Sequence, residues 1–396
     1  MPVAGASRGC LAVVLHCPIV AVRGDSVELS AKFLEEIERY AKFWPGTVRL
    51  IAFEDPNWAT SFGTTIRKIE SLPFELVVQS HDDLDERVFH DAAAVLCGIG
   101  HRYDHLAEMG RGLGVPVVYV AEWSRRTQNV ITAIDSPNAF VKARRLFWLW
   151  RQRRRIRKSI AAATALQCNG TPTFDEYAQL NPQRLLYFDS RITDDLLINR
   201  EELDGRTARL VEGAHPIQLV FTGRLTPTKG VLDLVAVAIE LRNREVDFKL
   251  SIVGDGDLVD ELRARIVRHQ LGSLMTVLAP KQFRSELIPF VQQMDLFVCP
   301  HPQGDPSCTY LETLACGVPI VGYANEALEG VARHSHAAWH VPLGKPSALA
   351  AEIARLAIAR AEVSAASIAA LQFATEHTFD KTYGRRVDQL RQLAGI

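Results

Sequence analysis

The feature that most constrains the fold of this chain is a repeated alternation between short apolar runs and amphipathic stretches. In the first half, the apolar runs occupy residues 11–20, 48–53, 74–80, 92–99 and 115–122. Runs of this kind are typical of strands that are buried on both faces. The stretch 28–44 instead places Leu29, Phe33 and Ile37 four residues apart, which predicts a helix with one apolar face. Strands that alternate with helices predict a parallel sheet covered on both sides.

A second series of the same kind begins after residue 205. Expected strands lie at 217–224, 248–256, 274–280, 295–300, 318–323 and 337–343, and expected helices lie at 230–244 and 257–271. The sequence therefore predicts two Rossmann-like domains, over residues 1–205 and 206–374, joined through the polar stretch 195–216. A terminal helix over 375–396 is expected to pack back on the first domain. Doubly wound sheets bind ligands at the carboxyl ends of their strands, so we expect a ligand in the cleft between the two domains.

Composition narrows the classes of function. The 396 residues include 45 basic and 46 acidic ones, and a net charge of -1 disfavours a chain devoted to nucleic-acid binding. No apolar run approaches the ~20 residues that cross a bilayer. The short apolar stretch near the N-terminus is expected to be a strand and not a signal peptide. The seven cysteines include no CxxC pair, which favours free thiols in the reducing cytoplasm.

Basic residues follow the first expected strand of the second domain. In FTGRLTPTKG, the strand ends at Gly223, and Arg224 and Lys229 flank a loop that leads into a helix. A diphosphate leaving group needs its growing negative charge neutralised, and cations beside free backbone N–H groups do this without a metal. The alternative interpretation is a solvated basic loop.

A second polar segment follows the strand at 295–300. Gly304, Asp305 and Pro306 form a turn into a helix expected from about Ser307. Its N-terminus would present N–H groups to the cleft, and Glu312, one to two turns later, would accept hydrogen bonds from ribose hydroxyls. The alternative is that Glu312 is an ordinary exposed helix residue.

Together these segments resemble the retaining GT-B glycosyltransferases of glycosyltransferase family 4. The resemblance covers residues 215–345 closely and the N-terminal half only by its alternation of elements. It rests on GRLTPTKG at 223–230, VGDG at 253–256, MDLFVCP at 294–300 and YLETLACGVPIVG at 310–322. The family's fold is two Rossmann-like domains that face each other across a cleft. The resemblance implies a hexosyltransferase that needs no metal and no cofactor and takes a nucleotide diphosphate sugar as donor.

The resemblance also implies roles for the matched positions. Arg224 and Lys229 would bind the diphosphate and stabilise the leaving group. Glu312 matches the second glutamate of the family's Glu-x7-Glu motif and would hold the ribose. The other implied donor-binding residues are Gly223, Gly254, Lys281 near the base, and Ser307, Cys308 and Thr309 through their backbone N–H groups.

Three positions depart from the family pattern or match it loosely. The first glutamate of the motif falls at Gly304, and Asp305 is expected to contact the sugar hydroxyls in its place. The family often has a histidine where this chain has Glu122, which is expected to bind sugar hydroxyls or the acceptor, to act as a base, or to be a structural carboxylate. Gly24 stands where family members use a glycine-rich turn near the acceptor side.

The implied reaction moves the sugar to a carbohydrate or lipid-linked glycan acceptor with retention, in polysaccharide or glycolipid biosynthesis. Two rivals remain open: a nucleotide-sugar epimerase on the same architecture, and a non-catalytic binding subunit. The nucleobase, the sugar, the acceptor and the oligomeric state are left open.

One basic segment is not accounted for by this chemistry. Nine of the seventeen residues from Lys142 to Lys158 are lysine or arginine, interleaved with Phe147, Trp148 and Trp150. A basic aromatic helix of this kind can lie on an anionic membrane surface, and such contact would place the protein at the inner face of the membrane. The alternative is a surface helix whose aromatic side chains pack inward.

Overall fold

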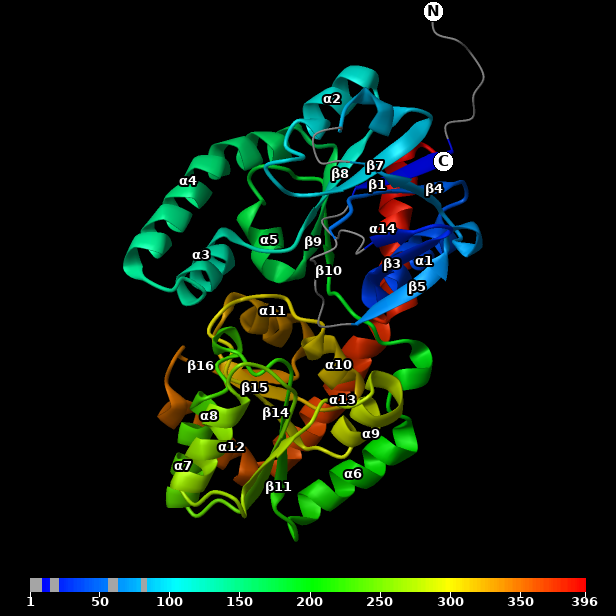
Figure 1. Cartoon of the computed structure of the whole chain (residues 1–396). Helices are drawn as coiled ribbons and strands as arrows, with labels where there is room; N and C mark the ends of the chain where they lie inside the picture. The colour runs from blue at the N-terminus through cyan, green and yellow to red at the C-terminus, as the bar shows by residue number, and fades with distance from the viewer. Residues whose placement is uncertain (1–8, 15–20, 56–62, 80–83) are drawn as a thin grey trace, which may run out of the picture.

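The computed structural model describes residues 9–14, 21–55, 63–79 and 84–396, and it contains two parallel sheets, one above the other in Figure 1. The first sheet has the strand order β10-β9-β8-β7-β1-β4-β6. Its strands are β1 (Cys10–Val14), β4 (Val48–Ala52), β6 (Glu75–Val78), β7 (Ala92–Gly98), β8 (Val117–Ala121), β9 (Ala165–Asn169) and β10 (Arg184–Tyr187). Its helices are α1 (Ala31–Phe43), α2 (Leu106–Leu113), α3 (Arg125–Ile134), α4 (Ala139–Ala162) and α5 (Gly170–Glu176).

The second sheet has the order β13-β12-β11-β14-β15-β16, again with parallel pairing throughout. Its strands are β11 (Ile217–Thr222), β12 (Phe248–Val253), β13 (Met275–Leu278), β14 (Leu296–Cys299), β15 (Ile320–Tyr323) and β16 (Ala338–Val341). The helices of this half are α6 (Arg200–Glu212), α7 (Asp233–Asn243), α8 (Val259–Arg268), α9 (Ile288–Val291), α10 (Thr309–Ala315), α11 (Glu326–Ser335), α12 (Pro346–Ile358) and α13 (Arg360–Glu376).

The predicted α/β class with two doubly wound sheets is confirmed. All six strands predicted for the second half are present, and a strand overlaps each of the five runs predicted for the first half. The predicted strand at 11–20 is described only as far as Val14. Each sheet has its own buried core, since continuous apolar strands need helices on both faces.

Two local predictions are wrong. Leu29 does not belong to a helix: it lies in β3 (Ser26–Ser30), which pairs antiparallel with β2 (Ala21–Arg23) and β5 (Thr64–Lys68) in a small third sheet. The polar stretch 195–216 is not an open linker, because most of it forms α6, which packs against α13. The buried Arg206 explains this: its guanidinium donates to the carbonyl oxygens of Gln292, Cys316 and Gly317.

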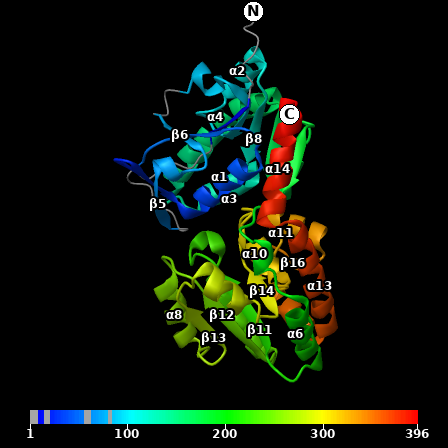
Figure 2. The ribbon, with the colours of Figure 1, turned by 90° about the vertical axis from the view of Figure 1, so that its right-hand side faces the viewer.

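The chain passes between the two halves twice. After β10, Phe188 and Ile192 already belong to the core of the second half. After α13, helix α14 (Phe379–Ala394) returns and packs against α1, β7 and β10, as Figure 2 shows beside the upper domain.

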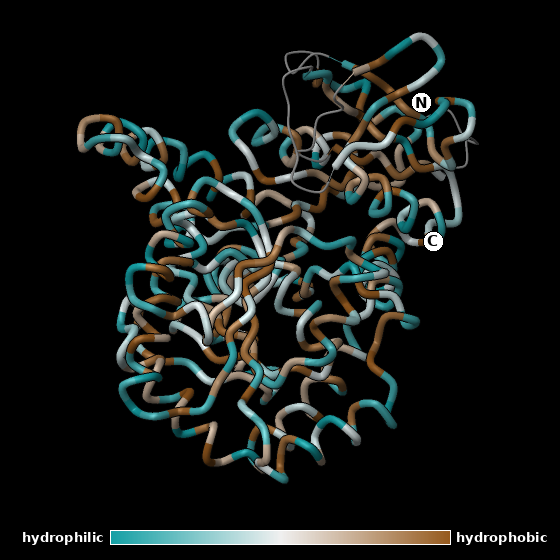
Figure 3. Tube along the Cα trace, turned by 60° about the horizontal axis from the view of Figure 1, so that its bottom comes forward, coloured by the Kyte–Doolittle hydropathy of each residue, from teal (hydrophilic) through white to brown (hydrophobic). Residues whose placement is uncertain are grey.

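Helices α3 and α4 pack against each other and extend sideways from the upper domain, on the left in Figure 1 and at the upper left of the trace in Figure 3. We call residues 125–162 the arm. Among the described residues, no single helix is long and apolar enough to cross a membrane, whereas the bent pair α12 and α13 passes that test of length and composition.

Candidate active site

Glycines follow the strands β11 and β12 of the second domain, where the donor was predicted to bind. Gly223 and Gly254 end β11 and β12 with φ values of +147° and +154°, a region that disfavours other residues. A Cβ atom on Gly254 would lie 1.9 Å from the carbonyl oxygen of Gly223. The two strand ends therefore approach too closely for side chains, and the backbone is left open to a ligand.

The basic turn after β11 has a defined geometry. Residues Pro227–Lys229 form a 3-10 turn that ends at Gly230, where φ is +66° and a Cβ would lie 2.0 Å from the carbonyl oxygen of Pro300. This places the Lys229 side chain in a buried position, with Nζ 3.6 Å from Oδ2 of Asp305. Arg224 stands exposed at the start of the same loop. The two predicted cations thus differ in setting: one is held, and the other faces solvent.

Asp305 links the two domains. Its Oδ1 accepts a hydrogen bond of 3.0 Å from Nε1 of Trp123, which follows β8 in the first domain. The neighbouring Gly304 explains the missing glutamate of the motif, because a Cβ there would lie 2.9 Å from Oγ1 of Thr127 and 3.1 Å from Cβ of Glu326. Thr127 of the first domain and Glu326 of the second therefore occupy the space that a glutamate side chain at 304 would need.

The helix after this turn begins later than predicted. Helix α10 starts at Thr309 and not at Ser307. The N–H group of Ser307 donates to the carbonyl oxygen of Asp305, and that of Thr309 donates to Oγ of Ser307. Glu312 is half-buried on α10, and burial is the main cause that raises the pKa of its carboxyl to about 7. This carboxylate is therefore poised to change charge near neutral pH.

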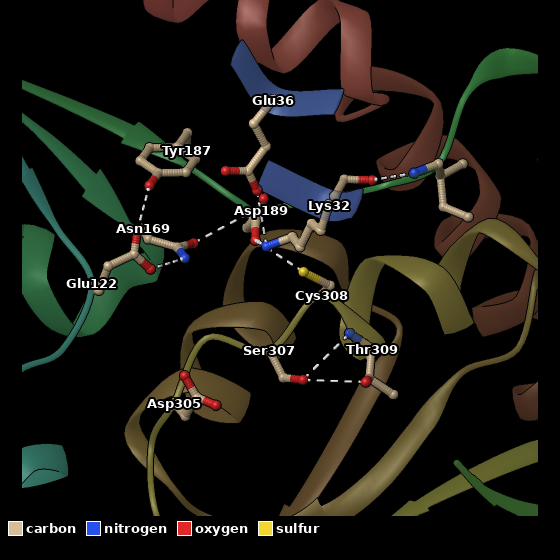
Figure 4. A network of polar contacts seen from close by, with 12 residues as sticks. Lys32, Glu36, Glu122, Asn169, Tyr187, Asp189, Asp305, Ser307, Cys308 and Thr309 are labelled. Atoms are coloured by element: carbon tan, nitrogen blue, oxygen red, sulfur yellow. Dashed lines mark hydrogen bonds and ion pairs between the residues drawn. The ribbon is translucent and has the colours of Figure 1, made fainter. Parts of the chain in front are cut away.

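A polar network faces these residues from the strand ends of the first domain (Figure 4). Glu122, just after β8, accepts hydrogen bonds from Nδ2 of Asn169 at 2.8 Å and from the hydroxyl of Tyr187 at 3.1 Å. Glu122 is exposed to solvent, but the protein around it removes part of its hydration. This desolvation raises the pKa of its carboxyl, and the charge of Asp189 raises the pKa further. These contacts hold the carboxylate in one orientation.

Asp189, just after β10, joins this network to the second domain. Its Oδ2 lies 2.6 Å from Nζ of Lys32 and accepts a hydrogen bond of 2.9 Å from the thiol of Cys308. Lys32 also pairs with Glu36 on α1 at 3.0 Å. Figure 4 shows the Cys308 thiol pointing from its loop toward Asp189. One of the predicted donor-binding residues is thus in direct contact with the first domain.

A cavity of about 370 Å³ lies beside this network. Its polar lining comes from Lys32, Glu36, Glu122, Trp123, Gln128, Tyr177, Tyr187, Asp189, Tyr383 and Arg386. Carboxylates, an indole ring and hydroxyl groups suit the hydroxyl groups and ring faces of a carbohydrate. Trp123, which lines this cavity, donates to Asp305, so the cavity is linked to the Asp305–Lys229 pair of the second domain.

Two predicted residues lie apart from this group. Lys281 follows β13 and places Nζ 5.2 Å from the ring centroid of Phe290. Gly24 lies in the β2–β3 hairpin with φ of +63° and is not part of the cavity lining. Lys32, Asn169 and Asp189 were missed from the sequence. The available signal was position, since Asn169 ends β9 and Asp189 comes two residues after β10.

The described residues contain no group of three or more histidine, cysteine, aspartate or glutamate side chains placed to hold a metal ion.

Comparison with known sequences finds a family match in the second half of the chain. Residues 216–358 match the profile of the family described as Glycosyl transferases group 1. Residues 216–358 therefore resemble a group 1 glycosyltransferase domain, and we call them the group 1 domain. The group 1 domain contains Arg224, Lys229, Asp305 and Glu312, and Glu122 lies outside it.

Two curated relatives of this chain are glycosyltransferases. Amylovoran biosynthesis glycosyltransferase AmsK of Erwinia amylovora is 26% identical over 194 residues, which is 47% of this chain and 47% of that protein. Putative colanic acid biosynthesis glycosyltransferase WcaL of Salmonella typhimurium is 25% identical over 145 residues, or 35% and 36% of the two chains. This chain thus spans less than half the length of these relatives.

Comparison of structures extends to the whole chain. The crystal structure of HepE from Anabaena in complex with UDP has a TM-score of 0.67, covers 98% of this chain and 100% of that chain, and is 14% identical. The group 1 domain and the domain that precedes it therefore share the GT-B fold.

Proposed function

We propose that this protein is a glycosyltransferase that moves a sugar from a nucleotide diphosphate donor to a glycan or lipid-linked acceptor in polysaccharide biosynthesis. The observation that carries the proposal is that polar sites of the two domains lie next to each other, joined by the Trp123–Asp305 and Asp189–Cys308 hydrogen bonds. The group 1 domain presents Arg224, Lys229 and the half-buried Glu312, and the first domain presents a carboxylate-lined cavity.

The donor half of the proposal rests on the basic turn. Buried and exposed cations beside glycine strand ends suit a diphosphate, whose charge grows as the sugar leaves. Lys229 is already buried against Asp305, so a bound diphosphate would replace a carboxylate partner with phosphate oxygens. The described UDP complex of a neighbour with the same fold supports a nucleotide as the ligand. We propose that the reaction needs no metal, because these cations supply the charge.

The acceptor half rests on the cavity. Glu122 is fixed by Asn169 and Tyr187, and its raised pKa suits a group that accepts a hydrogen bond or a proton from an acceptor hydroxyl. We propose that the acceptor hydroxyl attacks from the face that the diphosphate leaves, which retains the anomeric configuration. We further propose that the enzyme works in the cytoplasm, where nucleotide sugars are made.

The first experiment is a nucleotide titration. UDP, GDP, ADP and dTDP are titrated by calorimetry in the presence of chelator against the wild type, Lys229→Ala, and Lys249→Ala as a control on an exposed lysine of the same domain. We expect one nucleotide to bind, to lose roughly tenfold or more in affinity with Lys229→Ala, and to keep its affinity in the control. Binding of none of the four would contradict the donor site.

Turnover of a radiolabelled donor then separates the rivals. Release of nucleotide with transfer of label to an acceptor supports the transferase. Change of the sugar without release of nucleotide would indicate an epimerase, and nucleotide binding without turnover would indicate a non-catalytic subunit.

A further inference from the structure

The arm is a strongly charged surface element that the proposed reaction does not use. From Ala139 to Ala162, helix α4 carries nine basic residues and no aspartate or glutamate. Little of this charge is neutralised locally: Arg155 lies 3.6 Å from Asp104, while Arg153 and Arg145 donate to the neutral oxygens of Asn129 and of the Asp135 backbone. The arm therefore presents a concentrated positive field to whatever lies beside it.

Aromatic side chains stand on the outer face of this helix. The exposed fractions of Phe140, Phe147 and Trp150 are 78%, 59% and 55%, and the rings of Phe147 and Trp150 stack with centroids 5.7 Å apart. Trp148 is 46% exposed as well, so the alternative in which Phe147, Trp148 and Trp150 pack inward is wrong. Large exposed apolar groups that gather on one element mark a binding surface.

Charge and aromatic rings share that face. At 3.6 residues per turn, Arg151 and Arg154 lie on the same side of α4 as Phe147, and both are exposed. Leu149 and Ile156 fall on the opposite side and are half-buried. The helix thus carries its apolar rings and its cations together, away from the body of the protein.

We propose that the outer face of α4 docks on an anionic lipid bilayer. Arginine side chains are attracted to the phosphates of an anionic surface, while Phe and Trp rings insert among headgroups and upper acyl chains. Because exposed rings and cations share one face of α4, the rings can reach the acyl chains while the cations contact the phosphates. A nucleic acid would satisfy the cations as well, but the chain as a whole has a net charge of -1, which does not favour that partner.

The position of the arm ties this surface to the cavity. Helix α3 begins at Arg125, directly after Trp123 and Ser124, and Trp123 lines the cavity. The base of the arm is therefore the rim of the pocket. If the proposed transferase function holds, a bilayer under the arm presents a lipid-linked acceptor to the cavity, and this step alone rests on that function.

The test is flotation of the full chain with vesicles of phosphatidylcholine alone or mixed with phosphatidylglycerol. Two double variants alter the arm: Phe147→Ala with Trp150→Ala, and Arg151→Glu with Arg154→Glu. Their control is Arg263→Glu with Arg268→Glu, which reverses two exposed charges on α8 of the other domain.

We expect the wild type and the control to float with anionic but not with neutral vesicles, and each arm variant to lose at least about tenfold in partitioning. Equal loss in the control, or no flotation of the wild type, would overturn the proposal. Binding of a duplex RNA that vesicles fail to displace would assign the face to nucleic acid. Nucleotide affinity measured on the same preparations separates the two proposals, because the arm variants should bind nucleotide as the wild type does.

Discussion

At the residue scale, Glu312 combines burial with a position in the first turn of α10, where the charges of Arg191, Lys32 and Asp189 act on it. Burial raises the pKa of its carboxyl from 4.5 to about 7, despite the opposing charges of Arg191 and Lys32. A carboxyl whose pKa is raised on folding destabilises the folded state as pH rises from 4.5 toward 7. The ionised form of Glu312 thus destabilises the ligand-free protein, and hydroxyl groups of a ligand that donate hydrogen bonds to it would offset this cost.

This gives a prediction for nucleotide binding. The affinity of the wild type for its nucleotide is expected to rise about tenfold between about pH 6 and pH 8, because the ionised carboxylate accepts stronger hydrogen bonds. Glu312→Gln should bind more weakly at the upper pH and lose this rise. Calorimetric titration at both pH values measures the effect, and a Gln variant with an unchanged pH profile would exclude this role.

The residues of the two sites were predictable to different degrees. Arg224, Lys229 and Glu312 sit in continuous stretches whose spacing is visible along the chain. Lys32, Asn169 and Asp189 come from α1, β9 and the segment after β10, and only the order of the strands brings them together. The glycine at 304 was visible as a departure, but its reason, the approach of Thr127 from the other domain, is a tertiary fact.

At the scale of elements, the parallel strands were predictable because continuous apolar runs are rare outside buried strands. The sequence does not reveal β9, since its run ALQCN contains Gln167, which is buried and paired with Nε of Arg386 on the distant α14. Helix α6 was hidden for a similar reason. Its sequence is mostly polar, and its packing depends on the buried Arg206.

The role of Arg206 predicts a large effect on stability. Arg206→Met would leave the carbonyl oxygens of Gln292, Cys316 and Gly317 without their donor, at a cost of roughly 2–4 kcal/mol in the free energy of unfolding. Arg209→Met on the exposed side of the same helix should change it by less than about 0.5 kcal/mol. Urea denaturation followed by circular dichroism compares the two, and equal losses would contradict the assignment.

At the scale of the whole molecule, hydrogen bonds join the two domains. Glu326 at the start of α11 accepts hydrogen bonds from the hydroxyls of Ser124 at 2.5 Å and Thr127 at 3.3 Å, both in the first domain. Together with the Trp123–Asp305 and Cys308–Asp189 contacts, these bonds bring the two polar sites face to face.

Removal of this contact should open the protein. Glu326→Ala is expected to lower the ratio of closed to open molecules by about a hundredfold or more, because it removes two hydrogen bonds to a charged acceptor, each worth about 1.5–3 kcal/mol. Small-angle X-ray scattering without ligand should report a larger radius of gyration for this variant. Glu329→Ala, on the exposed side of the same helix turn, is the matched control. A radius that is unchanged in Glu326→Ala would mean that other contacts hold the cleft.

The return of α14 to the first domain has a mechanical consequence. The chain crosses between the domains once after β10 and again between α13 and α14, so two segments of the backbone connect the domains. The two connecting segments define a hinge axis. Rotation of one domain about this axis is easy, whereas twisting or sliding of one domain past the other would strain a connecting segment. Opening and closing should thus be a rotation about this one axis, which returns the two sites to the same relative position on each closure.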